Sequence, residues 1–135
     1  MTHNIQDLNE RTHNSVAYKD PNLVIGYSCG EDIETGLVVK HDPARKGVVM
    51  IAGAGEGFAI AHQGSKEGCV LEVAICCGGA CAKLGGTVAV GDSLVADANG
   101  KLIKGASGEF SIAVAETDGV LDDVIEVLMI GRPIA

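Results

Sequence analysis

Residues 93–104 read SLVADANGKLIK, and this stretch decides the fold class. Its centre, Asn99-Gly100, lies between two short apolar runs. Asparagine and glycine tolerate the positive φ that both central positions of a type I′ turn require, and this turn joins antiparallel strands. The stretch therefore predicts a β-hairpin.

Short apolar runs of the same kind recur after residue 20 and are separated by glycine. They comprise residues 23–25, 37–39, 48–51, 58–60, 70–76, 93–96, 102–103, 110–115 and 124–130. Glycine makes up 19 of the 135 residues. Because glycine costs about 0.5–1 kcal/mol in a helix interior, long helices are not expected. The pattern predicts a mainly β protein: a small antiparallel β-barrel or sandwich domain with at most one or two short helices.

One run shows the alternation of a half-exposed strand. Leu71, Val73 and Ile75 fall on one face of a strand, and Glu72 and Ala74 fall on the other. We therefore expect the first face to be buried and the second to be exposed.

Two further segments differ in how strongly they favour a strand. Residues 124–129 are β-branched at three of their first four positions, which favours a strand. A short helix fits best at residues 76–84, where alanine, lysine and leucine favour it and Gly78-Gly79 oppose it. No repeat of fixed period is evident in the sequence.

Residues 1–20 differ in composition from the rest of the chain. Nearly every side chain is polar or charged, and glycine is absent. Such a segment cannot bury enough apolar surface to order itself without a partner. We interpret it as an extended N-terminal arm, and residues 21–135 as a single β domain.

The charge balance argues against several classes of partner. With 18 acidic and 10 basic residues, the net charge is −8, which opposes binding to nucleic acid or to an anionic membrane surface. A run of about 18 apolar residues and an apolar signal-peptide segment are both absent. We therefore expect no nucleic-acid or membrane partner, and synthesis in a reducing cytoplasm.

Two glycine-rich motifs look like functional sites. Residues 26–30, GYSCG, match the G-x-S-x-G nucleophile elbow around Ser28, but no helix is predicted after the serine. Residues 53–57, GAGEG, lack the last glycine and the Lys-Ser/Thr pair of phosphate-binding loops. We interpret the first motif as a turn and the second as a loop between strands. We expect no catalytic residue and no cofactor.

The five cysteines do not form a recognised metal-binding motif. They are Cys29, Cys69, Cys76, Cys77 and Cys81. An odd count without an export signal argues against a disulfide framework. The last four follow the pattern C-x6-C-C-x3-C rather than the C-x2-C pairs of zinc and iron–sulfur sites, and neighbours on a strand point to opposite faces. We interpret the cysteines as small, buried core residues and expect no metal.

The histidines also lack a motif that would give them a chemical role. His41 and His62 follow apolar runs, without a His-x-x-x-His or His-Glu pattern. We interpret both as exposed loop residues.

Three stretches of the C-terminal half read VAVGDSLVADANGKLI (residues 88–103), FSIAVAE (110–116) and DVIEVL (123–128). Together they resemble the small capsid decoration, or cement, proteins of tailed bacteriophages. In that family a Gly-Asp-x-Leu step enters a hairpin with an Asn-Gly-Lys turn, a strand ending in Val-Ala-x-Glu follows, and a Val-Ile-x-Val-x-Leu strand closes the chain. The corresponding stretches here are residues 88–103, 110–116 and 123–128. Residues 112–116, IAVAE, lack the glycine that precedes the Val-Ala step in the family. The match covers somewhat under half of the chain.

The resemblance implies a structural virion protein. Such a protein has a small β-barrel-like domain, binds the outer surface of an assembled capsid as a homotrimer, stabilises the capsid and has no catalytic residues. Its partners would be the major capsid protein and other copies of itself. The polar arm suits strand addition to a partner's sheet edge. Val16 and Tyr18, two residues apart and so on one face of a strand, would be its apolar anchors.

Two alternative functions stay open. Residues 90–94, VGDSL, followed by a hairpin are also typical of barrel-sandwich domains that carry biotin or a lipoyl group on a lysine. The lysine here would be Lys101, although the Met-Lys-Met and Asp-Lys-Ala settings of carrier domains are absent. The other alternative is a small serine hydrolase that uses Ser28.

Overall fold

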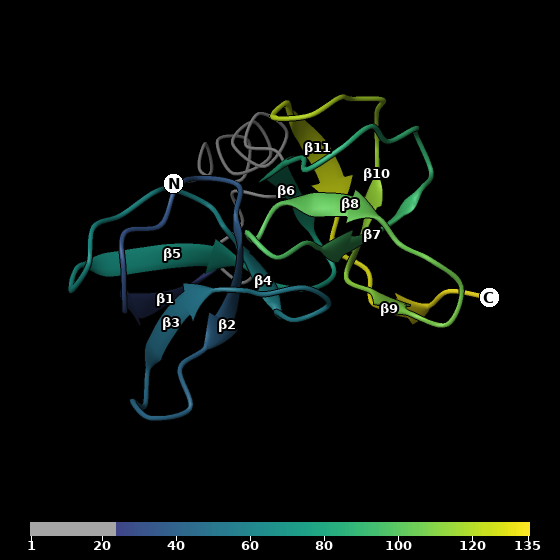
Figure 1. The fold of residues 1–135 in the computed structure, drawn as a ribbon. Coiled ribbons are helices and arrows are strands. Elements are labelled where there is room, and N and C mark those ends of the chain that lie inside the picture. Colours follow the sequence, from purple (N-terminus) through teal and green to yellow (C-terminus); the bar gives the residue numbers. More distant parts are fainter. Residues whose placement is uncertain (1–23) are drawn as a thin grey trace, which may run out of the picture.

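The structure, a computed structural model, describes residues 24–135 and consists of strands and turns (Figure 1). The strands are β1 (Val24–Cys29), β2 (Val38–His41), β3 (Val48–Ile51), β4 (Ala59–Ala61), β5 (Val70–Ala74), β6 (Gly79–Lys83), β7 (Ser93–Ala96), β8 (Leu102–Lys104), β9 (Phe110–Ser111), β10 (Ala113–Ala115), β11 (Val124–Leu128) and β12 (Arg132–Pro133). This range contains no helix. The predicted mainly β fold is confirmed.

Strands β1 to β5 form a closed barrel in the order β1-β3-β2-β4-β5. Neighbouring strands are antiparallel, except that β1 and β3 pair in parallel. The interior is filled by small and medium apolar side chains: Cys29, Ile33, Leu37, Val39, Val49, Ala59, Ala61, Leu71 and Val73. Closure leaves this half without a free strand edge.

The second half is a five-stranded sheet in the order β6-β11-β10-β7-β8. Its two edges approach each other just beyond β6, where Leu84 forms a parallel bridge with Leu102 of β8. Strands β9 and β12 pair as a separate two-stranded sheet. In Figure 1 this half, drawn in green and yellow, lies beside the blue and teal barrel.

The two halves share one topology and one strand register, about 54 residues apart. In each half the first strand pairs with the fifth, the fifth with the fourth, the fourth with the second and the second with the third, all antiparallel. The first and third strands then meet in parallel. Equivalent pairs are Ser28–Val70 and Lys83–Val124, Tyr27–Leu71 and Ala82–Ile125, Val39–Ala59 and Leu94–Ala113, and Ala61–Val73 and Ala115–Val127. Residues 24–135 therefore form a tandem structural repeat.

Inspection of the sequence did not reveal this repeat. Some equivalent turns use the same residue: Gly36 has a φ of 89° and Gly91 a φ of 87°. Others do not, since Gly68 has a φ of 82° where Asp122 has 67°. Several apolar residue types can fill the same inward-facing position of a strand. The strand register is therefore retained while the amino-acid identity is lost.

Backbone hydrogen bonds join the two halves. The Lys83 N–H donates to the carbonyl of Gly36, and the Val38 N–H donates to the carbonyl of Gly100, at 2.9 and 2.7 Å. The 36–38 segment of the first half therefore reaches both β6 and the turn that precedes β8. A buried cluster continues across the junction, in which Val38 and Ile60 belong to the same core as Leu84.

The hairpin predicted at residues 93–104 is confirmed, but its turn is not type I′. Strands β7 and β8 pair antiparallel, with Ala96 opposite Leu102. Among the turn residues only Gly100 has a positive φ, 78°. The Asp97 carboxylate accepts hydrogen bonds from the N–H groups of Asn99 and Lys101, at 2.8 and 3.0 Å. This Asx-type turn replaces the conformation that we expected from Asn-Gly.

Two further predictions need correction. Residues 79–83, predicted as part of a short helix, form β6, because pairing with β11 and burial of Ala80 and Ala82 outweigh helix propensity. In β5, Leu71 and Val73 are buried as predicted, whereas Ile75 lies beyond the strand and is only half-buried. Ala74 on the opposite face is also buried, because the second half covers it. The strand predicted near residues 124–129 is confirmed as β11.

Candidate interaction surface

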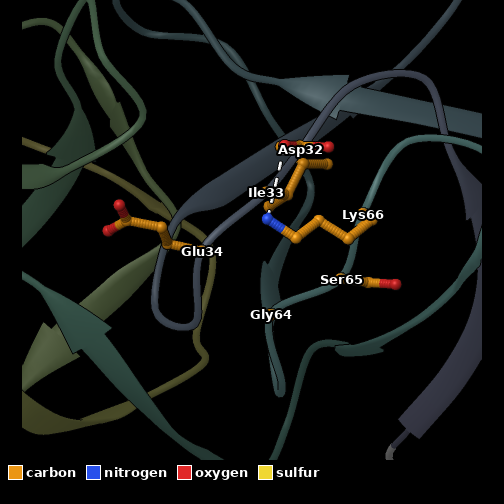
Figure 2. A pocket seen from close by; sticks show the side chains of 6 residues that line it. All are labelled: Asp32, Ile33, Glu34, Gly64, Ser65 and Lys66. Carbon is orange, nitrogen blue, oxygen red and sulfur yellow. Dashed lines mark ion pairs between the residues drawn. The ribbon is translucent and has the colours of Figure 1, made fainter.

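One end of the first barrel carries an open groove of about 450 Å³ (Figure 2). Its lining residues are Asp32, Ile33, Glu34, Gly64, Ser65 and Lys66. Lys66 extends toward Asp32, with Nζ and Oδ2 3.6 Å apart. Both side chains are largely exposed, so the ion pair adds little stability and leaves both charges available to a partner.

The backbone fixes the two loops that form the groove. Ile33 and Ser65 exchange two N–H···O hydrogen bonds of 2.9 Å. The Gly64 N–H donates to Thr35 Oγ1 at 2.7 Å, and the Glu67 N–H donates to Asp32 Oδ1 at 2.8 Å. The groove is therefore a fixed part of the barrel end.

Glu34 links the groove to the second half. Its side chain points away from the Asp32–Lys66 pair in Figure 2, and its Oε2 lies 3.1 Å from Nζ of Lys83. The backbone hydrogen bond between Gly36 and Lys83 lies two residues further along the same loop. In the first barrel this loop therefore contacts the neighbouring repeat.

The equivalent loops of the second half carry exposed apolar side chains. Val88 and Gly119 form the bridge that corresponds to Ile33–Ser65. Beside it, Val90 is 63% exposed, Val120 54% and Leu121 58%. We refer to the two loops that carry these three side chains as the apolar loop pair. Exposed apolar groups in neighbouring loops favour contact with another protein surface. The apolar loop pair is therefore the candidate interaction surface, and the charged groove lies at the equivalent loops of the first half.

Ser28 does not lie in a nucleophile elbow. It is an exposed residue within β1, and its Cα partner is Val70 on β5. The interpretation of residues 26–30 as a turn is therefore wrong, because residues 26–29 belong to β1, which pairs with β5. The chain continues into a turn rather than a helix. The strand-to-helix turn that the G-x-S-x-G motif requires is therefore absent at this position.

The glycine-rich residues 53–57 form part of the connection between β3 and β4, as predicted. Glu56 Oε1 accepts hydrogen bonds from the Gly53 N–H and from Lys40 Nζ, both at 2.9 Å. The Lys40 ammonium and then the Gly53 N–H lower the pKa of Glu56. The Glu56 carboxylate thus already accepts hydrogen bonds from the N–H and ammonium donors that a bound phosphate would need.

The prediction that the cysteines are buried is correct only for Cys29. It lies in the barrel core, and burial raises its pKa. The other four, Cys69, Cys76, Cys77 and Cys81, are exposed. Within residues 24–135, no group of three or more His, Cys, Asp and Glu side chains is placed to hold a metal ion.

Cys76 and Cys77 also do not point to opposite faces. They lie in the turn between β5 and β6 rather than on a strand, and their Sγ atoms are 3.1 Å apart. On β6, partial desolvation and then the carboxylate of Glu126 across the ladder raise the pKa of Cys81.

His41 and His62 both lie at strand ends, and His41 is the last residue of β2 rather than a loop residue. His41 is exposed at the end of β2, and its ring stacks on Phe58 with centroids 4.1 Å apart. Tyr27 meets both rings edge-on. His62, directly after β4, is half-buried rather than exposed.

Lys101 is engaged in an ion pair. Its Nζ lies 2.6 Å from Oδ1 of Asp122, and this hydrogen bond raises the pKa of Lys101. The Lys101 ammonium is therefore held by Asp122, which disfavours its use as the attachment point of a biotinyl or lipoyl group. Val16 and Tyr18, the predicted anchors of the N-terminal arm, lie outside the described residues.

Comparison with solved structures finds the same fold in a phage protein. The N-terminal base of the head fibre protein gp8.5 of bacteriophage phi29 superimposes with a TM-score of 0.67. The match covers 79% of this chain and 92% of that chain at 9% sequence identity. No protein-family model and no curated protein sequence matches this chain. Within the described part, no helix is long and apolar enough to cross a membrane.

Proposed function

We propose that this chain is a structural protein of a tailed-phage virion that binds the outer surface of the assembled capsid and stabilises it without catalysis. The observation that carries the proposal is the fold, which is shared with nearly the whole base of a phage head fibre. The resemblance of residues 88–128 to capsid decoration proteins supports it from the sequence.

The proposal assigns separate contacts to the two parts of the chain. The arm, residues 1–20, adds to a sheet edge of the major capsid protein, with Val16 and Tyr18 as apolar anchors. The apolar loop pair packs against the capsid or against another copy in a homotrimer. Several weak contacts then act together, because a trimer bound at several capsid sites gains effective concentration.

The test is cosedimentation of the purified chain with capsids of the virus that encodes it, followed by imaging of the decorated particles. We expect the full chain to sediment with capsids and to appear on their outer surface. Absence of the full chain from the capsid fraction would refute the proposed function.

A variant without residues 1–20 separates the role of the arm from that of the domain. We expect it to remain folded, by circular dichroism, and to lose capsid binding. Unchanged binding would refute the arm contact alone. Light scattering coupled to size exclusion tests the trimer, which a strict monomer both free and on capsids would contradict.

The repeat supplies a matched variant for the apolar loop pair. Glu67 of the first half is equivalent to Leu121 of the second, so Leu121→Glu gives both halves the same residue. We expect at least tenfold weaker capsid binding or trimerisation, with folding unchanged. Glu67→Gln, at the equivalent position of the first half and outside the residues that line the groove, is the control, and we expect it to bind as the parent does. Equal behaviour of the two variants would exclude the apolar loop pair as a contact.

A further inference from the structure

The connection between the two halves contains two adjacent cysteines. Residues 75–78 join β5 to β6, and Cys76 and Cys77 are both exposed in this turn. Their Sγ atoms lie 3.1 Å apart, closer than two sulfur atoms in ordinary contact and close enough to react with each other.

Two backbone hydrogen bonds to Met129 hold this turn. The Cys77 N–H donates to the carbonyl of Met129 at 2.6 Å, and the Met129 N–H donates to the carbonyl of Gly78 at 2.7 Å. Cys77 has a φ of 77°, and within residues 24–135 it shares positive φ outside glycine only with Asp122. A residue with a Cβ is strained in this region. Strain of this kind is concentrated at functional positions.

We propose that Cys76 and Cys77 form a redox-active vicinal dithiol, which a low-molecular-weight disulfide such as oxidised glutathione converts to an intramolecular disulfide. The inference rests on the geometry of the turn and does not depend on the proposed function. The two thiols share a solvent-exposed turn, so the oxidant can reach either sulfur.

The reaction balances through two exchange steps. A thiolate of the pair attacks one sulfur of the oxidant, the oxidant's S–S bond breaks, and the first small thiolate leaves and takes up a proton. The second cysteine then loses its proton and attacks the mixed disulfide, which releases the second small thiol. The protein loses two electrons and two protons, and one oxidant molecule becomes two thiols.

The hydrogen bond between the two sulfurs affects which of the two cysteines reacts first. It raises the pKa of Cys76, so less Cys76 thiolate is available for the first step. The second step is intramolecular and has a high effective concentration, so the mixed disulfide should not accumulate. Adjacent Cα atoms are about 3.8 Å apart, below the usual 4.4–6.8 Å of disulfides, so the product is strained and readily reduced.

The test treats the reduced full chain with oxidised glutathione and measures intact mass, thiol count and cysteine-containing peptides. We expect a loss of about 2 Da, the mass of two hydrogen atoms, a fall in free thiols from the five of the sequence to three, and one linked peptide that contains both Cys76 and Cys77. Mild dithiothreitol should restore the parent mass.

Single-cysteine variants make the outcome specific. Cys76→Ser and Cys77→Ser should stop at the glutathione adduct and form no internal disulfide. Cys69→Ser and Cys81→Ser, which remove other exposed thiols, should react as the parent does. A stable adduct on the parent chain, or a disulfide that involves Cys69 or Cys81, would overturn the proposal.

Discussion

The N–H of Lys83 donates a 2.9 Å hydrogen bond to the carbonyl of Gly36, and this bond joins the first strand of the second repeat to a turn of the first. The equivalent turn of the second half, at Gly91, has no such neighbour. The two turns have the same conformation in different surroundings. Substitution of both glycines therefore distinguishes the effect of backbone strain from the effect of contact between the halves.

The first prediction compares Gly36→Ala with Gly91→Ala. Both positions have positive φ, so both variants should lose about 1–2 kcal/mol of unfolding free energy from strain. At Gly36 the new Cβ would also lie 2.9 Å from the Lys83 nitrogen, whereas at Gly91 nothing lies within 4 Å. We expect an additional loss of about 1–3 kcal/mol for Gly36→Ala. Urea unfolding measures both, and equal losses would contradict the contact.

The second prediction concerns the shared core. Ile60 is fully buried where the first barrel packs on the second half, so Ile60→Ala should lower the unfolding free energy by about 2–5 kcal/mol. Val70, in the same barrel, is 72% exposed, and Val70→Ala should change it by less than about 0.5 kcal/mol. Thermal and urea unfolding provide the comparison. A small effect at Ile60 would show that the halves do not pack as described.

The third prediction concerns the Asp97 turn. Its carboxylate accepts two backbone hydrogen bonds in the hairpin, from Asn99 and Lys101. Asp97→Ala removes both acceptors and should cost about 1–3 kcal/mol. Asp97→Asn keeps a side-chain carbonyl oxygen and should recover part of the loss. If the two variants unfold at the same urea concentration, the hydrogen bonds do not stabilise the turn.

The fourth prediction is a pH dependence from Lys101 and Asp122. Their hydrogen bond lowers the pKa of Asp122 and raises that of Lys101. A lowered carboxyl pKa stabilises the fold above the pKa of the unfolded chain, and this effect is lost as the pH falls through the folded pKa. A raised lysine pKa stabilises it below the pKa of the unfolded chain, and this effect is lost as the pH rises through the folded pKa.

Asp122→Asn tests this dependence while keeping a residue type that tolerates positive φ. We expect the variant to be less stable than the parent near neutral pH, and the difference to disappear in strong acid and in strong base. Urea midpoints measured across the pH range provide the comparison. A difference that does not change with pH would assign the effect to shape rather than to charge.

Local patterns in the sequence were sufficient to locate most of the strands. The alternation around Leu71 and Val73 and the β-branched run at residues 124–129 correctly indicate β5 and β11. The segment that forms β6 could not be found in this way. Ala80 and Ala82 have a high helix propensity, and only the pairing with β11 places them in a strand. The candidate interaction surface was not predicted, because Val90, Val120 and Leu121 lie in separate loops that only the fold brings together.

The sequence by itself determined the fold class and the hairpin, because strand period, glycine content and turn residues act over a few neighbouring positions. Only the tertiary structure decided that residues 24–135 contain two copies of one five-strand topology, that Ala74 is covered, and that Cys76 and Cys77 face each other in a strained turn. These features depend on contacts between residues far apart in the chain. Such contacts constrain shape and register, which many residue types can satisfy, and so they leave little trace in the order of the amino acids.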